Sequence, residues 1–466
     1  MFRDYIVLSG GQMFSKLLGF IAFAYLARLL TVAQFGAVET VVGMSAIGYK
    51  VIELGTGSIA VRRIAQGTEQ LKTIIGAVIS ARMLIALMII PLLVMTYAGF
   101  TSDEVPALLI WFFALSLLAA PFAHEWLFQA HEKMGYAAFA PLLKMIVFLG
   151  AIFILAPANN GVAMVGAAEI FAMAAVALFF FFATKLSLHA GPLEYGLRPA
   201  VALLKDSAPL GASTFFNSVG LYAPVLIVAI AAGAEDAGLF GAAHRIVASV
   251  ITFSYVYYFN LLPLFSRLLH REPAALQRLM NASMRVTAWA GITASLGLWA
   301  LGDPIMTIVF GSNFAIAGPA FKMLVWMTIF EVVSGNARWL LVAAHRQTSV
   351  LASQIIGAVS AILLTFALAP SMGAYGAAIA VVIANGAIWV FAWLRTQGLP
   401  VRPPLAPVIR HLLAGVFAVV AITLAGPPPI VAAVIAAVVM LASAAFDGKF
   451  IPAIRSLADA KGAAHE

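Results

Sequence analysis

The residues of this sequence that could do chemistry are charged side chains placed inside long apolar runs. Lys16 lies within the run from Tyr5 to Leu30, about 16 Å from either end of its helix at 1.5 Å per residue. Ser9, Gln12 and Lys16 recur at spacings of three and four, which places them on one stripe of a helix. An ammonium group at that depth is costly in lipid and usually faces protein or water. Lys16 is therefore predicted to belong to an inward polar face.

Three charged residues share one face of the next apolar run, 37–61. Glu39, Lys50 and Glu53 lie within about 60° of one another at 100° per residue. Lys50 and Glu53 are i,i+3 neighbours, so a structural ion pair and a functional role are both open for them. Because a carboxylate can take up a proton or bind a cation, Glu39 and Glu53 are candidates for ion coupling.

A third polar stripe lies on the apolar run 237–265, where Arg245, Ser249 and Thr252 share a face. The same run contains the aromatic segment FSYVYYFN, residues 253–260. Such a segment could stack sugars or lipid, although interfacial belts and helix packing are commoner uses of aromatic residues.

Other charged residues in apolar runs are interpreted as structural. Arg28 and Arg82 lie nearer helix ends, where a long side chain can extend to the membrane interface. A role in helix packing or structure is assigned to Glu125, Lys144, Glu169, Glu331 and Arg338.

The composition decides the class of protein. Of the 466 residues 63% are hydrophobic and only 10% are charged, whereas a soluble domain carries about 25% charged residues. The chain is therefore predicted to be an all-α polytopic membrane protein. The net charge of +8 does not imply a nucleic-acid partner, because lysine and arginine collect in cytoplasmic loops of such proteins.

Enzymatic chemistry is not expected. Cysteine is absent, which excludes disulfides and thiolate sites. No phosphate-binding glycine loop with Gly-Lys-Ser/Thr is present, and the histidine spacing does not suit zinc. The serines have no convincing nucleophile context. We expect no catalytic residues, no metal site and no cofactor.

The elements that must position these side chains are membrane helices of about 20 residues. The sequence predicts fourteen, at residues 5–29, 37–61, 74–99, 106–129, 136–157, 161–184, 207–232, 237–265, 284–301, 318–343, 348–369, 374–395, 408–425 and 429–446. Lysine and arginine occur in every second connector and are missing from the others, such as TSDEV and GPPP. The positive-inside rule then places both termini in the cytoplasm and makes the helix number even.

The chain also repeats itself. AQFGAVETVV (33–42) resembles GLFGAAHRIV (238–247) at an offset of 205, and EWLFQAHEKM (125–134) resembles RWLLVAAHRQ (338–347). GVAMVGAAEI (161–170) resembles MGAYGAAIAV (372–381) in the same order. We therefore predict two pseudo-symmetric six-helix lobes, 1–200 and 201–400, followed by a C-terminal helix pair and cytoplasmic tail, 401–466. Transporters built in this way hold substrate near the membrane midplane between the halves.

The opening LSGGQMFSKLLGFIAFAYLARLLTVAQFGAVE, the later GTGSIAVRRIA and the phrase LLVAAHRQ resemble one family. This is the polysaccharide-transport branch of the multidrug/oligosaccharidyl-lipid/polysaccharide exporter superfamily, the Wzx-like flippases. The resemblance implies transport of an undecaprenyl-pyrophosphate-linked oligosaccharide from the cytoplasmic to the outer leaflet of the bacterial inner membrane. It also implies alternating access, an ion gradient as the driving force, and a polymerase and other polysaccharide-assembly proteins as partners. A cationic cavity is typical of the family, and Lys16, Lys50 and Arg245 are the cations that this sequence places on polar stripes.

Three alternatives remain open from the sequence. A lipid II flippase has a closely similar architecture and substrate. A multidrug antiporter of the same superfamily would prefer acids in its cavity for cationic drugs, whereas cations are at least as prominent here. A membrane scaffold that assembles polymerising enzymes without transporting anything is the third.

Overall fold

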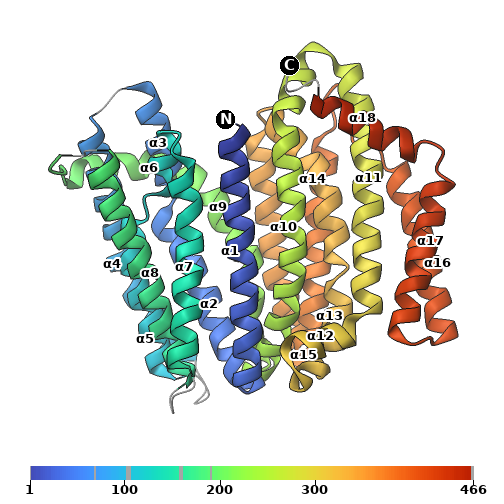
Figure 1. Ribbon diagram of the computed structural model, residues 1–466, viewed down its shortest axis with the longest axis horizontal. Coiled ribbons are helices and arrows are strands. Elements are labelled where there is room, and N and C mark those ends of the chain that lie inside the picture. The colour runs from blue at the N-terminus through green and yellow to red at the C-terminus, as the bar shows by residue number, and fades with distance from the viewer. Residues whose placement is uncertain (1, 68–69, 101–105, 157–160, 189–190, 463–466) are drawn as a thin grey trace. The chain divides into compact units, whose positions relative to one another are not determined.

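The computed structural model describes residues 2–67, 70–100, 106–156, 161–188 and 191–462, and every regular element in these ranges is helical (Figure 1). The contacts between residues divide the chain into two compact units, Met1–Gly238 and Leu239–Glu466. The predicted all-α membrane fold is confirmed.

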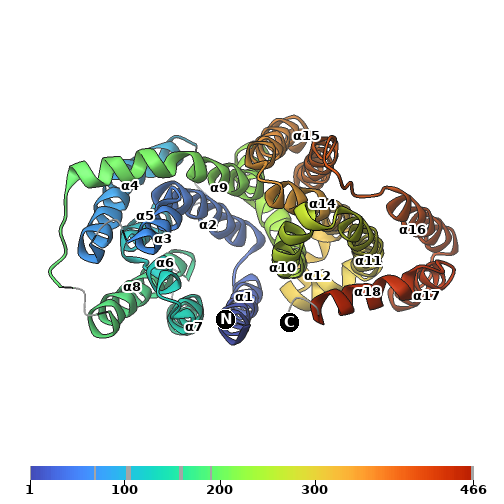
Figure 2. The same cartoon turned by 90° about the horizontal axis from the view of Figure 1, so that it is seen from above.

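Unit 1 is a bundle whose longest helices run side by side, with α1 packed on α7 and α7 on α8 (Figure 1). Its elements are α1 (Phe2–Leu29), α2 (Val32–Glu53), α3 (Thr56–Gln66), α4 (Leu71–Phe100), α5 (Ala107–Ser116), the 3₁₀ helix η1 (Leu117–Phe122), α6 (Glu125–Ala130), α7 (Met134–Leu155), α8 (Gly161–Ser187) and α9 (Leu197–Ala231). The first turns of α9 run across one end of this bundle (Figure 2). The helix packs on α2 and α4.

Unit 2 is a second bundle, in which α11 packs on α14, α16, α17 and α18. Its elements are α10 (Ala234–Arg271), α11 (Pro273–Ala300), α12 (Gly302–Phe310), the 3₁₀ helix η2 (Ser312–Ala317), α13 (Gly318–Leu324), α14 (Met327–Ala343), α15 (Gln347–Arg395), α16 (Ala406–Ala425), α17 (Pro429–Ala445) and α18 (Phe450–Gly462). Helix α18 is bent by 83° from α17 and lies across the end of the bundle (Figure 2).

Ten helices of the described residues are long and apolar enough to cross a membrane, or twelve if each of two bent pairs is one span. The predicted number of fourteen stays a prediction. Part of the difference is α15, whose 49 residues cover two predicted segments. Gly373 interrupts this helix with φ 53° and ψ −136°, a conformation that glycine adopts without a Cβ penalty. The chain turns back there, because a straight helix of that length would far exceed the roughly 30 Å membrane core.

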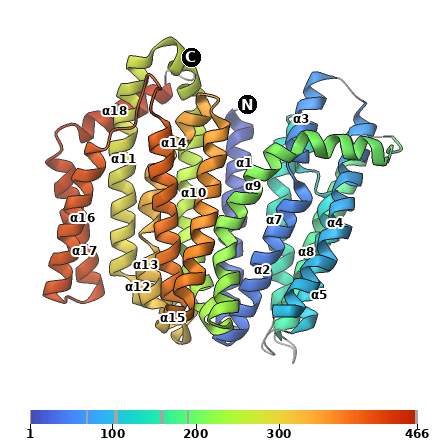
Figure 3. The same cartoon turned by 180° about the vertical axis from the view of Figure 1, so that it is seen from behind.

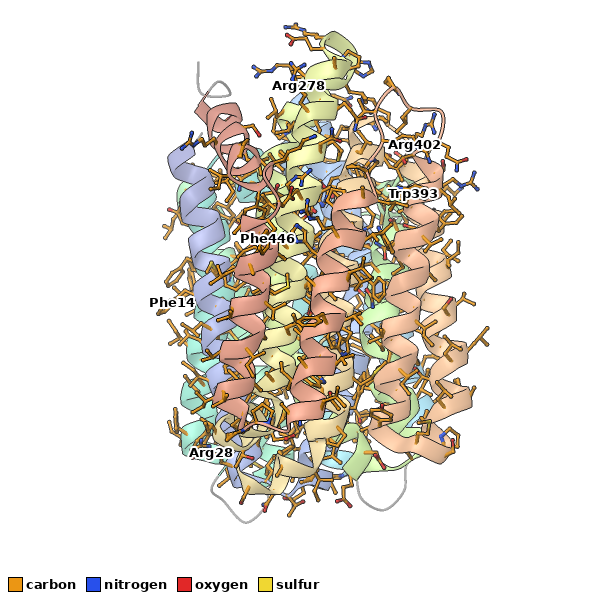
Figure 4. All side chains as sticks on the ribbon, turned by 90° about the vertical axis from the view of Figure 1, so that its right-hand side faces the viewer. Phe14, Arg28, Arg278, Trp393, Arg402 and Phe446 are labelled. Carbon is orange, nitrogen blue, oxygen red and sulfur yellow. The ribbon has the colours of Figure 1, made fainter. Side chains whose placement is uncertain are left out.

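Within each unit the basic connectors gather at one end. In unit 1 this end carries α3, α6 and the start of α9, together with the start of α1 (Figure 1). In unit 2 the basic end carries the α10–α11 connection and α18, while α12 and the α16–α17 hairpin lie at the other end (Figure 3). Arg278 and Arg402 both lie at that basic end of unit 2 (Figure 4). The arrangement agrees with the predicted alternation of connectors.

The boundary between the units does not coincide with the predicted lobe boundary at residue 200. Helix α9 belongs to unit 1 by its contacts with α2 and α4, whereas the sequence repeat assigns it to the second lobe. The division 1–200, 201–400 and 401–466 describes the repeat rather than the packing, and it stays a prediction.

Candidate functional site

The position of Lys16 follows from how α1 packs on α7. Gly11 lies against Ala138, and a Cβ on this glycine would come within 2.7 Å of the Ala138 carbonyl oxygen. Four residues later the Ser15 hydroxyl donates a 2.8 Å hydrogen bond to the Pro141 carbonyl. Lys16 comes one residue after this seam, which turns it about 100° away from α7. Lys16 is exposed, as is Gln12 on the same stripe.

Lys50 and Glu53 form the ion pair that the sequence left open, with 2.7 Å between Nζ and Oε2. The pair remains accessible, because 38% of the Lys50 side chain and 26% of the Glu53 side chain are exposed. It lies where α2 ends, and Leu54 and Gly55 follow with φ values of 38° and 70° before α3 begins. Gly55 is needed there because α9 approaches closely, and a Cβ would come within 2.9 Å of the Gly211 nitrogen.

Glu39 lies elsewhere on α2. It is buried, at 7% exposure, and eleven residues separate it from Lys50, which is about 16 Å along the helix axis. The structure therefore brings Glu53, but not Glu39, to the Lys50 ammonium. The three residues share one face of α2, as the sequence predicted, but Glu39 lies at a different height along the helix from Lys50 and Glu53.

Arg82 does not extend to the membrane interface, and that prediction was wrong. The residue is 2% exposed. Its Nε donates to the Thr56 hydroxyl at 2.9 Å and its Nη1 donates to the Ala123 carbonyl at 2.9 Å. These two acceptors lie at helix breaks, between α2 and α3 and between η1 and α6. Arg82 thus fastens two broken spans to each other, which satisfies a carbonyl that would otherwise be unpaired.

Further charges complete a cluster around Lys50. Glu125, the first residue of α6, is influenced electrostatically by Glu53, Lys50, Arg82 and Lys144. Lys144 on α7 in turn forms a 2.7 Å ion pair with Glu169 on α8. We call Lys50, Glu53, Arg82, Glu125, Lys144 and Glu169 the unit 1 cluster. Its three cations and three carboxylates carry formal charges that cancel.

The sequence did not identify the unit 1 cluster as a whole. Its acids and bases come from five helices, and periodicity within one helix does not reveal partners on another. One usable signal was Pro121 in the run PFAHEW, because a proline followed by polar residues in an apolar run indicates a broken span.

Arg245 is half-buried on α10 in unit 2, on the polar stripe that the sequence predicted. The hydroxyls of this stripe bond to their own helix. Ser249 donates to the Arg245 carbonyl at 2.8 Å, and Thr252 donates to the Ala248 carbonyl at 3.1 Å. Ahead of the arginine, His244 stacks on Phe240 with 5.7 Å between ring centroids.

A buried polar network lies between α10, α11 and α14 of unit 2. Asn336 donates to the Tyr258 hydroxyl at 2.7 Å and to Thr287 at 3.0 Å, and it accepts from Ser283 at 2.6 Å. The Tyr258 hydroxyl donates to the Val332 carbonyl at 2.6 Å. Glu331 and Arg338 form an ion pair beside it, and both are 8% exposed. We call the following residues the unit 2 network: Tyr255, Tyr257, Tyr258, Ser283, Thr287, Glu331, Asn336 and Arg338.

The cluster and the network occupy equivalent positions of the sequence repeat. The offset of 205 pairs Lys50 with Tyr255, and the EWLFQAHEKM repeat pairs Glu125 with Arg338. In unit 1 Lys50 and Glu125 interact electrostatically, and in unit 2 the Tyr255 hydroxyl and Arg338 interact electrostatically. Each unit therefore places a polar contact between the same two helices of its repeat.

A hollow of about 510 Å³ at the α6–α7 turn lies apart from these groups. Its lining includes Lys133, Tyr136 and Phe179. The Lys133 ammonium donates to the Ser187 carbonyl at 2.7 Å, and the Ser187 hydroxyl donates to Tyr136 at 2.7 Å. Lys133 therefore ties the turn to the end of α8. Among the described residues, no group of three or more histidine, aspartate and glutamate side chains could hold a metal ion.

Two named proteins are similar in sequence. The chain is 27% identical over 328 residues to the succinoglycan biosynthesis transport protein ExoT of Rhizobium meliloti, covering 66% of this chain and 62% of ExoT. It is 24% identical over 403 residues to Agl15 of Haloferax volcanii, named a probable low-salt glycan biosynthesis flippase, covering 81% and 79%. Both names denote transport, as the sequence predicted.

Solved structures show the same fold. The inward closed lipid II flippase MurJ aligns with a TM-score of 0.75 at 15% identity, covering 95% of this chain and 98% of MurJ. An inward-facing multidrug transporter of the MATE family aligns with a TM-score of 0.64 at 14% identity, covering 84% and 97%. At such identities the likeness concerns the fold, which is that of a multi-pass membrane transporter. The sequence profile described as "Polysaccharide biosynthesis protein" matches residues 1–269, more than half of the chain, and the protein belongs to this family.

Proposed function

We propose that this chain is a flippase that moves an undecaprenyl-pyrophosphate-linked oligosaccharide from the cytoplasmic to the outer leaflet of the bacterial inner membrane by alternating access. Family membership and the names of both relatives support transport in polysaccharide biosynthesis. The observation that carries the proposal is the accessible Lys50–Glu53 pair inside a span. An ammonium in such a place can exchange its carboxylate for a substrate phosphate.

Lys16, Lys50 and Arg245 hold the pyrophosphate in this proposal. A lysine binds phosphate as a point charge, while an arginine can engage two of its oxygens. Lys16 is exposed and Arg245 half-buried, so neither side chain is sealed in a core. On Lys50 the phosphate replaces Glu53, whose carboxylate is then released from its partner.

The released carboxylate links substrate binding to an ion gradient. Glu53 takes up a proton or a cation when the phosphate occupies Lys50, and Glu39 is the second candidate. Glu53→Gln and Glu39→Gln test them separately, because the two residues lie about 21 Å apart along the axis of α2. We expect Glu53→Gln to weaken the dependence of transport on the gradient. If both variants transport with unchanged gradient dependence, the coupling site lies elsewhere.

The proposed orientation places both termini in the cytoplasm. A reporter fused after Glu466 should report a cytoplasmic position, and one inserted in AGAED, residues 232–236, an external one. A cytoplasmic signal from the second site would contradict the two-lobe arrangement and the direction of transport.

The substrate is tested in a strain that lacks the protein. Labelling of the lipid-linked sugar from the outer surface should fall when the chain is deleted and return when it is restored. Lys50→Ala and Arg245→Ala should fail to restore it at normal protein level, whereas Lys50→Arg should restore part. Unimpaired sugar labelling with loss of outer-leaflet lipid II, or with altered efflux of a cationic drug, would favour the alternatives. Unchanged export together with loss of polymerase from the membrane complex would indicate a scaffold.

A further inference from the structure

The aromatic segment 253–260 of α10 divides into residues with different roles. Tyr258 is 1% exposed, and its ring fills the space that a Cβ on Gly335 would occupy. Tyr257 is half-buried and its hydroxyl donates to Ser283 at 2.9 Å. Tyr257 and Tyr258 therefore pack between helices, which is one of the commoner uses of aromatic residues noted for this segment. Tyr255 differs, because 44% of it is exposed.

Tyr255 continues the polar stripe of α10. Arg245, Ser249, Thr252 and Tyr255 follow one another at spacings of four, three and three, which keeps them on one side of the helix. Ten residues separate Tyr255 from Arg245, which is about 15 Å along the axis. An anion on Arg245 would therefore have room for a sugar unit before the ring is reached.

The tyrosine is not placed as an interfacial belt residue. It lies well inside the 38 residues of α10, about 30 Å from the start and about 24 Å from the end. Belt residues lie near helix ends with their polar tip towards the headgroups. The Tyr255 hydroxyl is instead influenced electrostatically by Glu331 and Arg338, which form a buried ion pair. The polar tip of the accessible ring thus lies near a buried ion pair.

An accessible aromatic ring next to hydroxyl groups suits a saccharide. One face of a pyranose is a patch of C–H groups that stacks on an aromatic ring, and its hydroxyls point outwards to polar neighbours. The neighbouring groups on the stripe, Thr252 and Ser249, are hydroxyls. A lipid tail would gain nothing from these groups, because it has no hydrogen-bonding partner for them.

We propose that Tyr255 is the stacking surface of a saccharide subsite on α10, next to the pyrophosphate position at Arg245. The inference rests on the proposed function, because it requires a pyrophosphate-linked sugar as substrate. It assigns the sugar portion to unit 2 and makes Tyr255 a determinant of whether a sugar is recognised.

The test compares two probes on the full-length chain in lipid nanodiscs. One probe is undecaprenyl pyrophosphate carrying a single glucose or galactose, and the other is undecaprenyl pyrophosphate without sugar. Tyr255→Ala should weaken binding of the sugar-bearing lipid about tenfold and leave binding of the sugar-free lipid unchanged. Tyr255→Trp should restore most of the difference, because it keeps a stacking surface. Tyr255→Phe should fall between them, because it keeps the ring but loses the hydroxyl.

Phe253 supplies the matched control. It is 59% exposed on the same helix but lies about 160° around the axis from Tyr255. Phe253→Ala should bind both probes as the parent does. Equal weakening of both probes by Tyr255→Ala, or no weakening of either, overturns the saccharide subsite while the proposed function stands. A parent protein that binds neither probe overturns the proposed function and the subsite with it.

Discussion

The unit 1 cluster and the unit 2 network occupy equivalent positions in the repeat, yet they differ in chemistry. The unit 1 cluster has six charged groups from five helices, and its Lys50–Glu53 pair is partly exposed. The unit 2 network has one ion pair, Glu331–Arg338, with both side chains 10% exposed, beside hydroxyl and amide groups. One arrangement is electrostatic and accessible, and the other is hydrogen-bonded and buried.

The difference shows where a partner can be exchanged. Removing one member of a buried ion pair leaves an uncompensated charge, at a cost of about 3–5 kcal/mol. An exposed pair contributes about 1 kcal/mol or less. Lys50 can therefore leave Glu53 for a phosphate at little cost, whereas Arg338 cannot leave Glu331. We infer that the ion pair of the unit 1 cluster can exchange its partner, whereas the ion pair of the unit 2 network is structural.

The largest effect is expected for Arg338→Leu. The variant leaves the Glu331 carboxylate buried without its partner, so we expect a loss of about 3–5 kcal/mol in the free energy of unfolding. Thermal unfolding of the purified protein in detergent measures it. The double variant Glu331→Gln, Arg338→Leu should recover much of the loss, because no buried charge then remains. If Arg338→Leu lowers the free energy of unfolding no more than Lys50→Leu does, the two ion pairs do not differ in the way proposed.

Arg82→Leu should rank second. It removes two buried hydrogen bonds, to Thr56 and to the Ala123 carbonyl. The acceptors left behind are neutral, so the loss in the free energy of unfolding should be smaller than for a carboxylate left buried without its partner. We expect lower stability and increased protease cleavage near residues 54–55 and 123–124, where the spans are broken. Arg82→Lys should recover part of the stability, because it can still reach one acceptor. Unchanged cleavage at both breaks would show that Arg82 does not hold them together.

Lys50→Ala should impair transport much more than it lowers the stability of the protein. We expect the free energy of unfolding to fall by about 1 kcal/mol or less, because the pair is accessible, while sugar export falls at least about tenfold. Thermal unfolding and outer-leaflet labelling of the same variant provide both values. Lys144→Ala is the matched control, since it also removes an ammonium from an ion pair of the cluster. Equal loss of export in both variants would mean that cluster charge in general, rather than Lys50, is required.

The smallest effect concerns pH, at the connector between α8 and α9. Hydrogen bonds from Lys72 and Thr73 lower the pKa of the Glu194 carboxyl below its ordinary value of 4.5. Because the pKa is lower in the folded protein, the stabilisation is present above pH 4.5 and is lost as the pH falls through the folded pKa. Glu194→Gln should remove this slope from an acid titration of thermal stability and leave stability at pH 7 slightly lower. A slope that persists in the variant must come from other carboxyls.

Part of the site was predictable because it depends on one helix at a time. The stripes through Lys16 and Arg245 follow from residue spacing on a helix. Lys50 and Glu53 are three residues apart on one helix, so their ion pair could also be anticipated. Arg82 was misassigned because its distance from the helix end indicated an interfacial residue, whereas two broken helices surround it with acceptors.

The sequence by itself determined the class of protein, the apolar segments, the direction in which each polar stripe faces on its helix, and the repeat. These properties are local, since hydropathy and helical period act within some twenty residues. Only the tertiary structure decided which charges pair across helices, as with Lys144 and Glu169, and which tyrosine of 253–260 stays accessible. The reason is physical: the energy of a charge or a ring inside a membrane protein depends on its neighbours, and those neighbours come from distant parts of the chain.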